Sequence, residues 1–140
     1  RKTQPISRHR MNDILVSSKP SCRCGDAREV IQSVMGRSDD VFHLEKSDGS
    51  IEMIVPDLIR RAVMQMSDEI TDYIAIQKGP ELIEVQLKPD GLGELSMSGF
   101  DDLWSTKAVK PPNVEVAKYS HIPSTTKLRR IYREKFSSDD

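Results

Sequence analysis

The chain has 140 residues, of which 36% are hydrophobic, 5% aromatic and 31% charged. So little apolar and aromatic content predicts one modest core with extended arms, not 140 uniformly packed residues. With two cysteines, no N-x-[ST] sequon, no signal peptide and no apolar run of membrane length, the sequence argues against a disulfide-rich secreted domain and against a membrane span. We therefore expect an intracellular protein, in the cytoplasm or the nucleus.

The net charge of −1 conceals a segregation of charge along the chain. Residues 1–37 carry eight Lys and Arg against three acids, a net charge of +5. Residues 38–102 carry five against fifteen, a net charge of −10, and residues 103–140 carry eight against four, a net charge of +4. Basic ends beside an acidic middle predict contact with the middle of the same chain, with a second copy, or with an external polyanion.

The first 26 residues predict an extended basic arm, because "RKTQPISRHR" is charged and has no periodic pattern. The apolar triplet "ILV" at 14–16 is expected to add a short strand to the edge of a sheet. The stretch "DAREVIQSVMG" then predicts a short helix, which Asp26 caps and Gly36 ends. Its apolar face would hold Val30, Ile31 and Val34.

Residues 41–55, "VFHLEKSDGSIEMIV", alternate between apolar and polar on both sides of a turn. Asp48-Gly49 tolerates the positive φ angles of a tight turn, so this stretch predicts a β-hairpin. In "PDLIRRAVMQMSDEITDYIAIQKG" apolar residues recur every three or four positions, which predicts one long amphipathic helix over 56–79. Its apolar stripe contains Ile59, Ala62, Val63, Met66, Ile70, Tyr73 and Ile74.

A second hairpin is expected in "ELIEVQLKPDGLGELSMSGF". Ile83, Val85 and Leu87 would share one face, Pro-Asp-Gly would turn the chain, and Leu95 and Met97 would return it. Two hairpins that flank one helix form a ββαββ unit, so the predicted fold class is α+β with a four-stranded antiparallel sheet. We expect three regions: an extended basic arm at 1–26, a short helix plus the ββαββ core at 27–100, and a linker with a basic C-terminal helix at 101–140.

The last region has weaker patterns. A Pro-Pro break precedes a short strand that we expect at 114–116. The stretch "STTKLRRIYREKF" predicts the final basic helix, with Ser124 as its cap. The apolar side of this helix would hold Leu128, Ile131, Tyr132 and Phe136.

The sequence contains little that indicates catalysis. Cys22 and Cys24 lie one residue apart in "SCRCGD", which is closer than the usual zinc-binding pair, and the three histidines are isolated along the chain. We favour a simple turn for this stretch, and the alternative is a reactive thiolate beside Arg23. No nucleophile elbow, phosphate-binding loop, dinucleotide fingerprint or zinc-protease motif occurs. We therefore expect no enzymatic activity, no metal and no cofactor.

The remaining candidate sites are surfaces. Basic residues that can neutralise phosphates occur in the arm and in the final helix: Arg8, Arg10, Lys127, Arg129, Arg130 and Arg133. Apolar residues outside the regular core are candidates for contact with a protein partner: Ile14, Leu15, Val16, Leu103, Trp104, Leu128 and Tyr132. Leu103 and Trp104 have a second interpretation, as a cap over the open end of the sheet.

Partial similarities to known families each cover less than half of the chain, so we assign no family. The stretch "VQLKPDGLGELSM" resembles part of the flagellar hook-length control proteins. The order hairpin, helix, hairpin is similar to the dimerisation domain of vesiculovirus phosphoproteins and to the start of a ubiquitin-like β-grasp.

The sequence contains no recognisable catalytic motif, but it does predict a folded core. Together these observations predict a non-enzymatic protein–protein interaction or assembly module. Its partner would be another protein or a second copy, with a homodimer as the expected state and no membrane as partner. One alternative is a nucleic-acid-binding module that uses the basic arm and the C-terminal helix. Another is a small enzyme with an unrecognised site. Salt dependence separates the first two, because phosphate contacts weaken steeply as salt rises.

Overall fold

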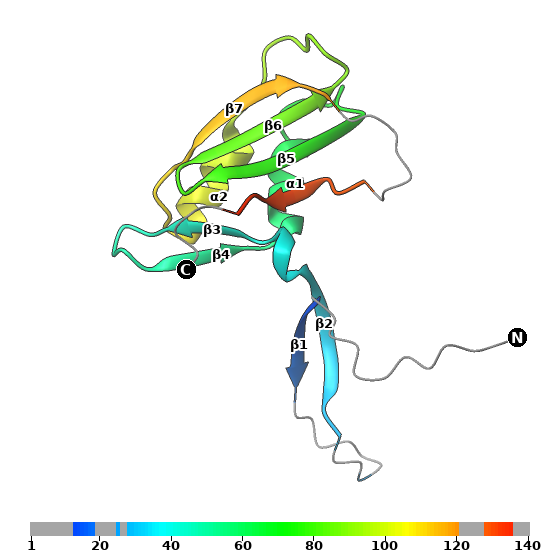
Figure 1. Ribbon diagram of the computed structural model, residues 1–140, viewed down its shortest axis with the longest axis vertical. Coiled ribbons are helices and arrows are strands. Elements are labelled where there is room, and N and C mark those ends of the chain that lie inside the picture. The colour runs from blue at the N-terminus through cyan, green and yellow to red at the C-terminus, as the bar shows by residue number, and fades with distance from the viewer. Residues whose placement is uncertain (1–12, 19–24, 26–27, 121–127, 136–140) are drawn as a thin grey trace, which may run out of the picture.

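The computed structural model describes residues 13–18, 25, 28–120 and 128–135. A layered body contains most of these residues, and a two-stranded hairpin projects from it (Figure 1). The elements follow the chain in this order: β1 (Asp13–Ser18), β2 (Val30–Arg37), the 3₁₀ turn η1 (Ser38–Asp40), β3 (Phe42–Glu45), β4 (Ile51–Ile54), α1 (Pro56–Met64), β5 (Asp72–Gly79), β6 (Leu82–Lys88), α2 (Ser98–Lys107), β7 (Asn113–Lys118) and β8 (Ile131–Arg133).

The largest layer is a four-stranded sheet with the strand order β7-β6-β5-β8. β5 and β6 form an antiparallel hairpin, whereas β7 runs parallel to β6 and β8 runs parallel to β5. A parallel neighbour requires a crossover, because a tight turn can only reverse the chain. α2 lies in the crossover between β6 and β7 (Figure 1). The sheet is therefore mixed, with one antiparallel and two parallel strand pairs, and not purely antiparallel as predicted.

Both helices pack on one face of this sheet (Figure 1). Pro56 occupies the first turn of α1, where its missing N–H and fixed φ are favourable. α1 and α2 approach closely at Gly99, where a Cβ atom would lie 3.1 Å from the Cα of Ala62 and 2.3 Å from the side-chain oxygen of Gln65. Phe100 and Trp104 stack below the sheet with ring centroids 5.5 Å apart. A side chain at position 99 would therefore require the Gln65 side chain to move and α1 to shift slightly.

The β3–β4 hairpin lies below the main sheet and packs into the same core as the helices (Figure 1). Its inner face buries Phe42, Leu44 and Ile54 in the same core as the helices. The backbone N–H of Lys110 donates to the carbonyl of Glu45 (2.8 Å), beside an isolated bridge between Lys46 and Val109. These bonds attach β3 to the segment between α2 and β7.

Several predictions from the sequence are confirmed. The hairpin around Asp48-Gly49 is β3–β4, and Gly49 has the expected positive φ of 83°. The strand expected at 114–116 is β7. Residues of the predicted apolar stripe are buried, as are the three residues that were expected to share a face on β6: Ile83, Val85 and Leu87.

The predicted ββαββ fold class is wrong, because the long helix over 56–79 does not exist. α1 ends at Met64, and the second half of the stretch is the strand β5. Positions 73–77 are all buried, so this central strand is shielded on both faces, and such strands read as near-continuous apolar runs. A strand with two buried faces places apolar residues at adjacent positions, so Ile70, Tyr73 and Ile74 matched a helical spacing by coincidence. The β-branched and aromatic composition of "DYIAI" was the opposing signal.

Three further elements differ from the prediction. The stretch expected to be a short helix after Asp26 contains β2, whose Val30, Ile31 and Val34 favour a strand once β1 is available to pair with it. Residues 95–97 do not return as a strand; β6 instead pairs with β5, and the chain continues into α2. The described part of the expected C-terminal helix forms β8 at the edge of the sheet. Its expected cap Ser124 and its last apolar residue Phe136 lie outside the described residues.

Candidate interaction surface

The β1–β2 hairpin, called the projecting hairpin below, is the part of the described chain that stands away from the body (Figure 1). Its two strands are antiparallel, and their pairing runs from Asp13 opposite Arg37 to Ser18 opposite Val30. The register shifts twice, after Ile14 and after Val16, so β2 carries one extra residue at each shift. Such bulges bend and twist a strand pair. The triplet at 14–16 therefore forms a strand, as predicted, but it pairs with β2 and not with the edge of the main sheet.

Apolar side chains occupy both faces of the projecting hairpin. Residues directly opposite each other in an antiparallel pair share a face, and successive residues of one strand alternate between faces. Leu15 pairs with Val34 and Ser17 with Ile31, so these four residues lie on one face. Val34 is 63% exposed and Ile31 57%. The opposite face carries Ile14, Val16 and Val30, of which the last two are also exposed.

The base of the projecting hairpin is attached firmly to the body. Gly36 has a φ of 118°, which a residue with a side chain rarely adopts, and a Cβ atom there would lie 3.3 Å from the ring of Pro56. One turn later, Asp40 forms an ion pair with Arg129, which immediately precedes β8. Only the three residues of η1 and Val41 separate β2 from β3. This short, anchored connection directs the hairpin away from its own body.

The residues predicted for partner binding divide into two groups. Ile14, Leu15 and Val16 lie on the projecting hairpin, where Leu15 and Val16 are exposed. Leu103 and Trp104 are buried in the core on α2, which is the alternative interpretation that the sequence left open. Leu128 and Tyr132 lie at the other end of the chain, beside Arg129; its guanidinium carbon is 5.5 Å from the centroid of the Tyr132 ring. The structure does not bring the two groups together into one site.

Two of the residues predicted for phosphate binding contact carboxylates of the chain itself. Arg129 pairs with Asp40, and Nε of Arg130 donates to Oδ1 of Asp72 (2.8 Å). Arg133 is half-buried in β8. Three others lie outside the described residues: Arg8, Arg10 and Lys127.

The Asp72 carboxylate accepts three hydrogen bonds. Besides the Arg130 bond, its Oδ2 accepts a hydrogen bond from the Tyr119 hydroxyl (2.8 Å) and its Oδ1 accepts one from the backbone N–H of Tyr73 (2.9 Å). Partial burial acts to raise the pKa of Asp72, but the bonds from Arg130, Tyr119 and Tyr73 outweigh it and lower this pKa. Asp72 therefore ties the segments next to β7 and β8 to the start of β5.

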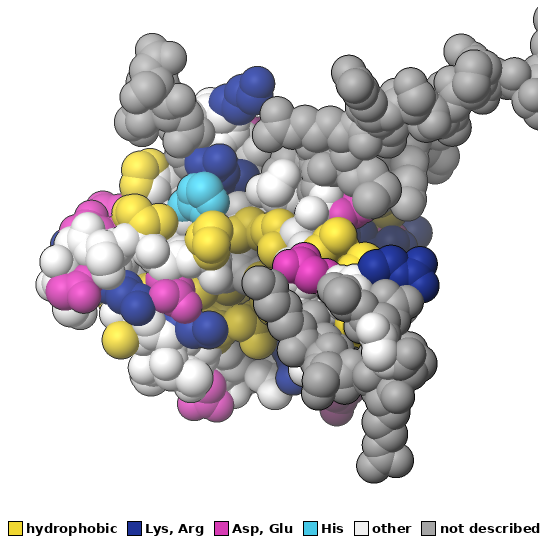
Figure 2. Space-filling view, turned by 90° about the horizontal axis from the view of Figure 1, so that it is seen from below, with side chains coloured by type: hydrophobic (Ala, Val, Ile, Leu, Met, Phe, Trp, Pro, Cys, Tyr) yellow, Lys and Arg dark blue, Asp and Glu magenta, His cyan; other side chains and the backbone are white. Residues whose placement is uncertain are grey.

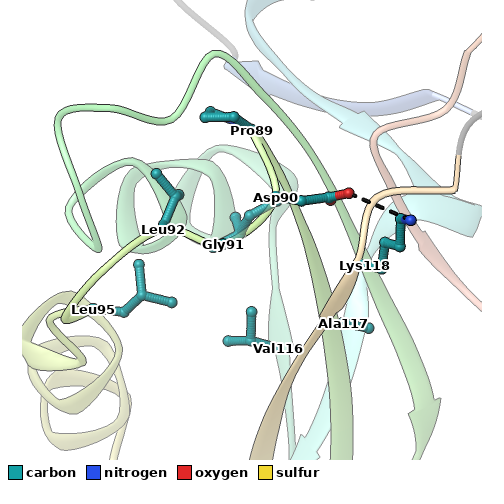
Figure 3. A pocket seen from close by; sticks show the side chains of 9 residues that line it. Pro89, Asp90, Gly91, Leu92, Leu95, Val116, Ala117 and Lys118 are labelled. Carbon is teal, nitrogen blue, oxygen red and sulfur yellow. Dashed lines mark ion pairs between the residues drawn. The ribbon is translucent and has the colours of Figure 1, made fainter.

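A shallow groove of about 440 Å³ lies beside β7 (Figure 3). Its walls are mainly aliphatic and come from β7 and from the loop after β6, with Leu92, Leu95 and Val116 among them. An ion pair between Asp90 and Lys118, 3.8 Å apart, lies at one end (Figure 3). No sequence pattern predicts this groove, because "KPDGLGEL" predicts a hairpin turn. The groove can hold an apolar side chain, but it offers no arrangement of a nucleophile with a base.

Other kinds of site have no support in the part of the chain that the structure describes. Within these residues, no three His, Cys, Asp or Glu side chains gather as a metal site would require. Neither α1 nor α2, the helices of the described ranges, has the length and apolar character needed to cross a membrane. Cys22 and Cys24 lie outside the described residues, so the interpretation of "SCRCGD" as a turn stays a prediction.

Comparison with known proteins gives no further indication of a site. No protein-family model matches the chain, and no curated protein is similar to it. The candidate site therefore rests on the geometry of the projecting hairpin.

Proposed function

We propose that the chain is a non-enzymatic assembly module that forms a homodimer through the projecting hairpin. The supporting observation is the exposed apolar surface on both faces of this hairpin. An isolated two-stranded hairpin is marginally stable in water. Contiguous exposed apolar surface is typical of a protein–protein contact. A second copy would bury this surface, which stabilises by about 25 cal/mol for each Å² of apolar area removed from water.

The distribution of charge supports the same proposal. Residues 13–37, which contain the projecting hairpin, carry a net charge of +1, the twelve residues before them carry +4, and residues 38–102 carry −10. The first 37 residues of one copy are therefore attracted to the acidic middle of another. Nucleic-acid binding has less support, because Arg129 and Arg130 already bind Asp40 and Asp72. The low cysteine content supports an intracellular setting, which we include in the proposal.

Sedimentation equilibrium over a wide range of protein concentrations tests the proposal. The chain has a mass of 15.9 kDa, and we expect the apparent mass to approach twice this value as concentration rises. The double variant Ile31→Thr with Val34→Thr removes apolar contact area from one hairpin face while threonine keeps the preference for a strand. We expect this variant to dimerise at least about tenfold more weakly, which corresponds to roughly 1.4 kcal/mol.

A matched control uses the polar neighbours on the same strand. Gln32→Thr with Ser33→Thr changes two exposed residues of β2 without removing apolar area, and it should leave the dimer unchanged. A mass of one chain at every concentration would contradict the proposal. Equal weakening by both double variants would show that strand stability, and not apolar contact, was responsible.

A further inference from the structure

A second exposed apolar surface lies on the outer face of the β3–β4 hairpin. Cross-strand pairing places His43 opposite Met53 and Glu45 opposite Ile51, so these four residues share the face that points away from the core. Ile51 and Met53 are each 60% exposed, among the most exposed large apolar side chains in the described ranges. Viewed from below, the molecule shows apolar side chains gathered across this side (Figure 2).

The projecting hairpin leaves the body on this same side but does not cover this surface within its own chain. Figure 1 shows the hairpin standing clear of β4. The Gly36 contact with Pro56 and the ion pair between Asp40 and Arg129 hold its base in that direction. The exposure of Ile51 and Met53 is the direct consequence.

We propose that the projecting hairpin of one copy lies across the outer face of the β3–β4 hairpin of the other copy. Leu15, Ile31 and Val34 of one chain would pack against Ile51 and Met53 of its partner. Because both surfaces lie on one side of the same chain, a two-fold axis creates the contact twice and closes the assembly as a dimer. This inference rests on the proposed function, for which it names the surface that receives the hairpin.

Charge distinguishes this arrangement from contact between two projecting hairpins. The projecting hairpin, residues 13–37, carries a net charge of +1, so contact between two hairpins brings like charges together. Hairpin-to-body contact instead brings this segment to the β3–β4 hairpin, whose residues 42–54 carry one Lys against three acids, a net charge of −2. Opposite charges at an interface speed association and disfavour wrong pairings.

Complementation between two variants tests the inference. The hairpin variant carries Leu15→Thr with Val34→Thr, and the receiving-face variant carries Ile51→Thr with Met53→Thr. All four side chains lie on exposed strand faces, so each variant should keep the thermal stability of a dilute wild-type sample. Alone, each variant should dimerise about tenfold more weakly or worse. Mixed in equal amounts, they should form a heterodimer tighter than either homodimer, because one of its two contacts is intact.

The outcomes separate failure of this inference from failure of the proposed function. A wild-type chain that is monomeric at all concentrations contradicts both. A receiving-face variant that dimerises like the wild type, with no gain on mixing, overturns the inference and leaves the hairpin as the contact. Val116→Thr is the matched control, because Val116 is 49% exposed on β7 beside the groove. Loss of dimer in this variant would move the receiving surface to β7 and overturn the inference.

Cross-linking provides a second readout that does not depend on affinity. In a background with Cys22→Ser and Cys24→Ser, the pair Val34→Cys and Met53→Cys should give a covalent dimer with a short bismaleimide reagent. The pair Val34→Cys and Val116→Cys should give none. The reverse pattern would contradict the inference.

Discussion

Gln77 illustrates how one buried polar side chain joins two separate sheets. The residue lies in β5 with none of its surface exposed. Its amide oxygen accepts a hydrogen bond from the backbone N–H of His43 (2.8 Å), and its amide nitrogen donates to the carbonyl of His43 (2.7 Å). The amide therefore pairs with β3 as a neighbouring strand would. Through this pair the main sheet holds the β3–β4 hairpin in place.

Replacing Gln77 with Leu should destabilise the fold by about 2–4 kcal/mol, since the partly buried backbone N–H and C=O of His43 would each lose the hydrogen bond to the amide. Urea unfolding followed by circular dichroism measures this change. Gln32→Leu provides the control, because Gln32 is an exposed strand residue of β2, and its replacement should leave the stability of the body unchanged. A Gln77→Leu variant as stable as the wild type would show that the amide does not hold the two sheets together.

At the scale of elements, Asp72 connects three strands at one end of the sheet. β7 and β8 are edge strands with one neighbour each, so their ends depend on contacts beyond the ladder. Tyr119, which follows β7, and Arg130, which precedes β8, both donate to the Asp72 carboxylate. These donors stabilise the ionised form, which explains why the pKa of Asp72 is lowered despite its partial burial.

The sign of the resulting pH dependence follows from this lowered pKa. The contribution of Asp72 to stability is fully present above its unfolded pKa of about 3.9 and is lost as pH falls through the lower folded value. We expect Asp72→Asn to lower the free energy of unfolding by about 1–2 kcal/mol at neutral pH, a figure reduced for solvent screening. The stability of this variant should also depend less on pH below about 4 than that of the wild type. Urea unfolding at pH 7 and at several acidic pH values measures both effects.

Asp68→Asn is the control for this experiment, because Asp68 is an exposed aspartate in the loop between α1 and β5. It should keep both the neutral stability and the acid dependence of the wild type. An Asp72→Asn variant whose stability falls with decreasing pH as steeply as that of the wild type would contradict the role assigned to Asp72.

At the scale of the whole molecule, the body and the projecting hairpin are energetically separable. Every member of the hydrophobic core cluster lies between positions 42 and 131, so the hairpin contributes nothing to that cluster. The hairpin touches the body mainly at its base, around Gly36 and Pro56. The body should therefore fold without the hairpin, whereas the dimer should not form without it.

Deletion of residues 1–37 tests this separation. The melting temperature of the full chain should rise with protein concentration, since association stabilises the folded state by mass action. The shortened chain should melt cooperatively at one temperature, whatever its concentration. Differential scanning calorimetry at low and high concentration provides the measurement. Loss of cooperative melting on deletion would show that the body needs the hairpin in order to fold.

The sequence by itself determined the elements that depend on short-range chemistry. Asp48-Gly49 specified the β3–β4 turn, Pro56 and Asp57 marked the start of α1, and alternation on β6 identified its buried face. The apolar triplet at 14–16, which the sequence marks as a candidate for partner contact, lies on β1, where Leu15 and Val16 are exposed. The stripe residues were correctly expected to be buried, although they belong to a helix, a loop and a strand.

Only the tertiary structure decided the features that depend on distant neighbours. Residues 72–79 form a strand because β6 and β8 flank them, and residues 30–37 form a strand because β1 pairs with them. Arg129 meets Asp40 from 89 positions away, and Gln77 meets His43 from 34 positions away. Local patterns cannot report such contacts, because the free energy that stabilises them comes from surfaces that only the folded chain brings together. The outer face of β3–β4 became a candidate receiving surface for the same reason: its exposure depends on where the projecting hairpin points.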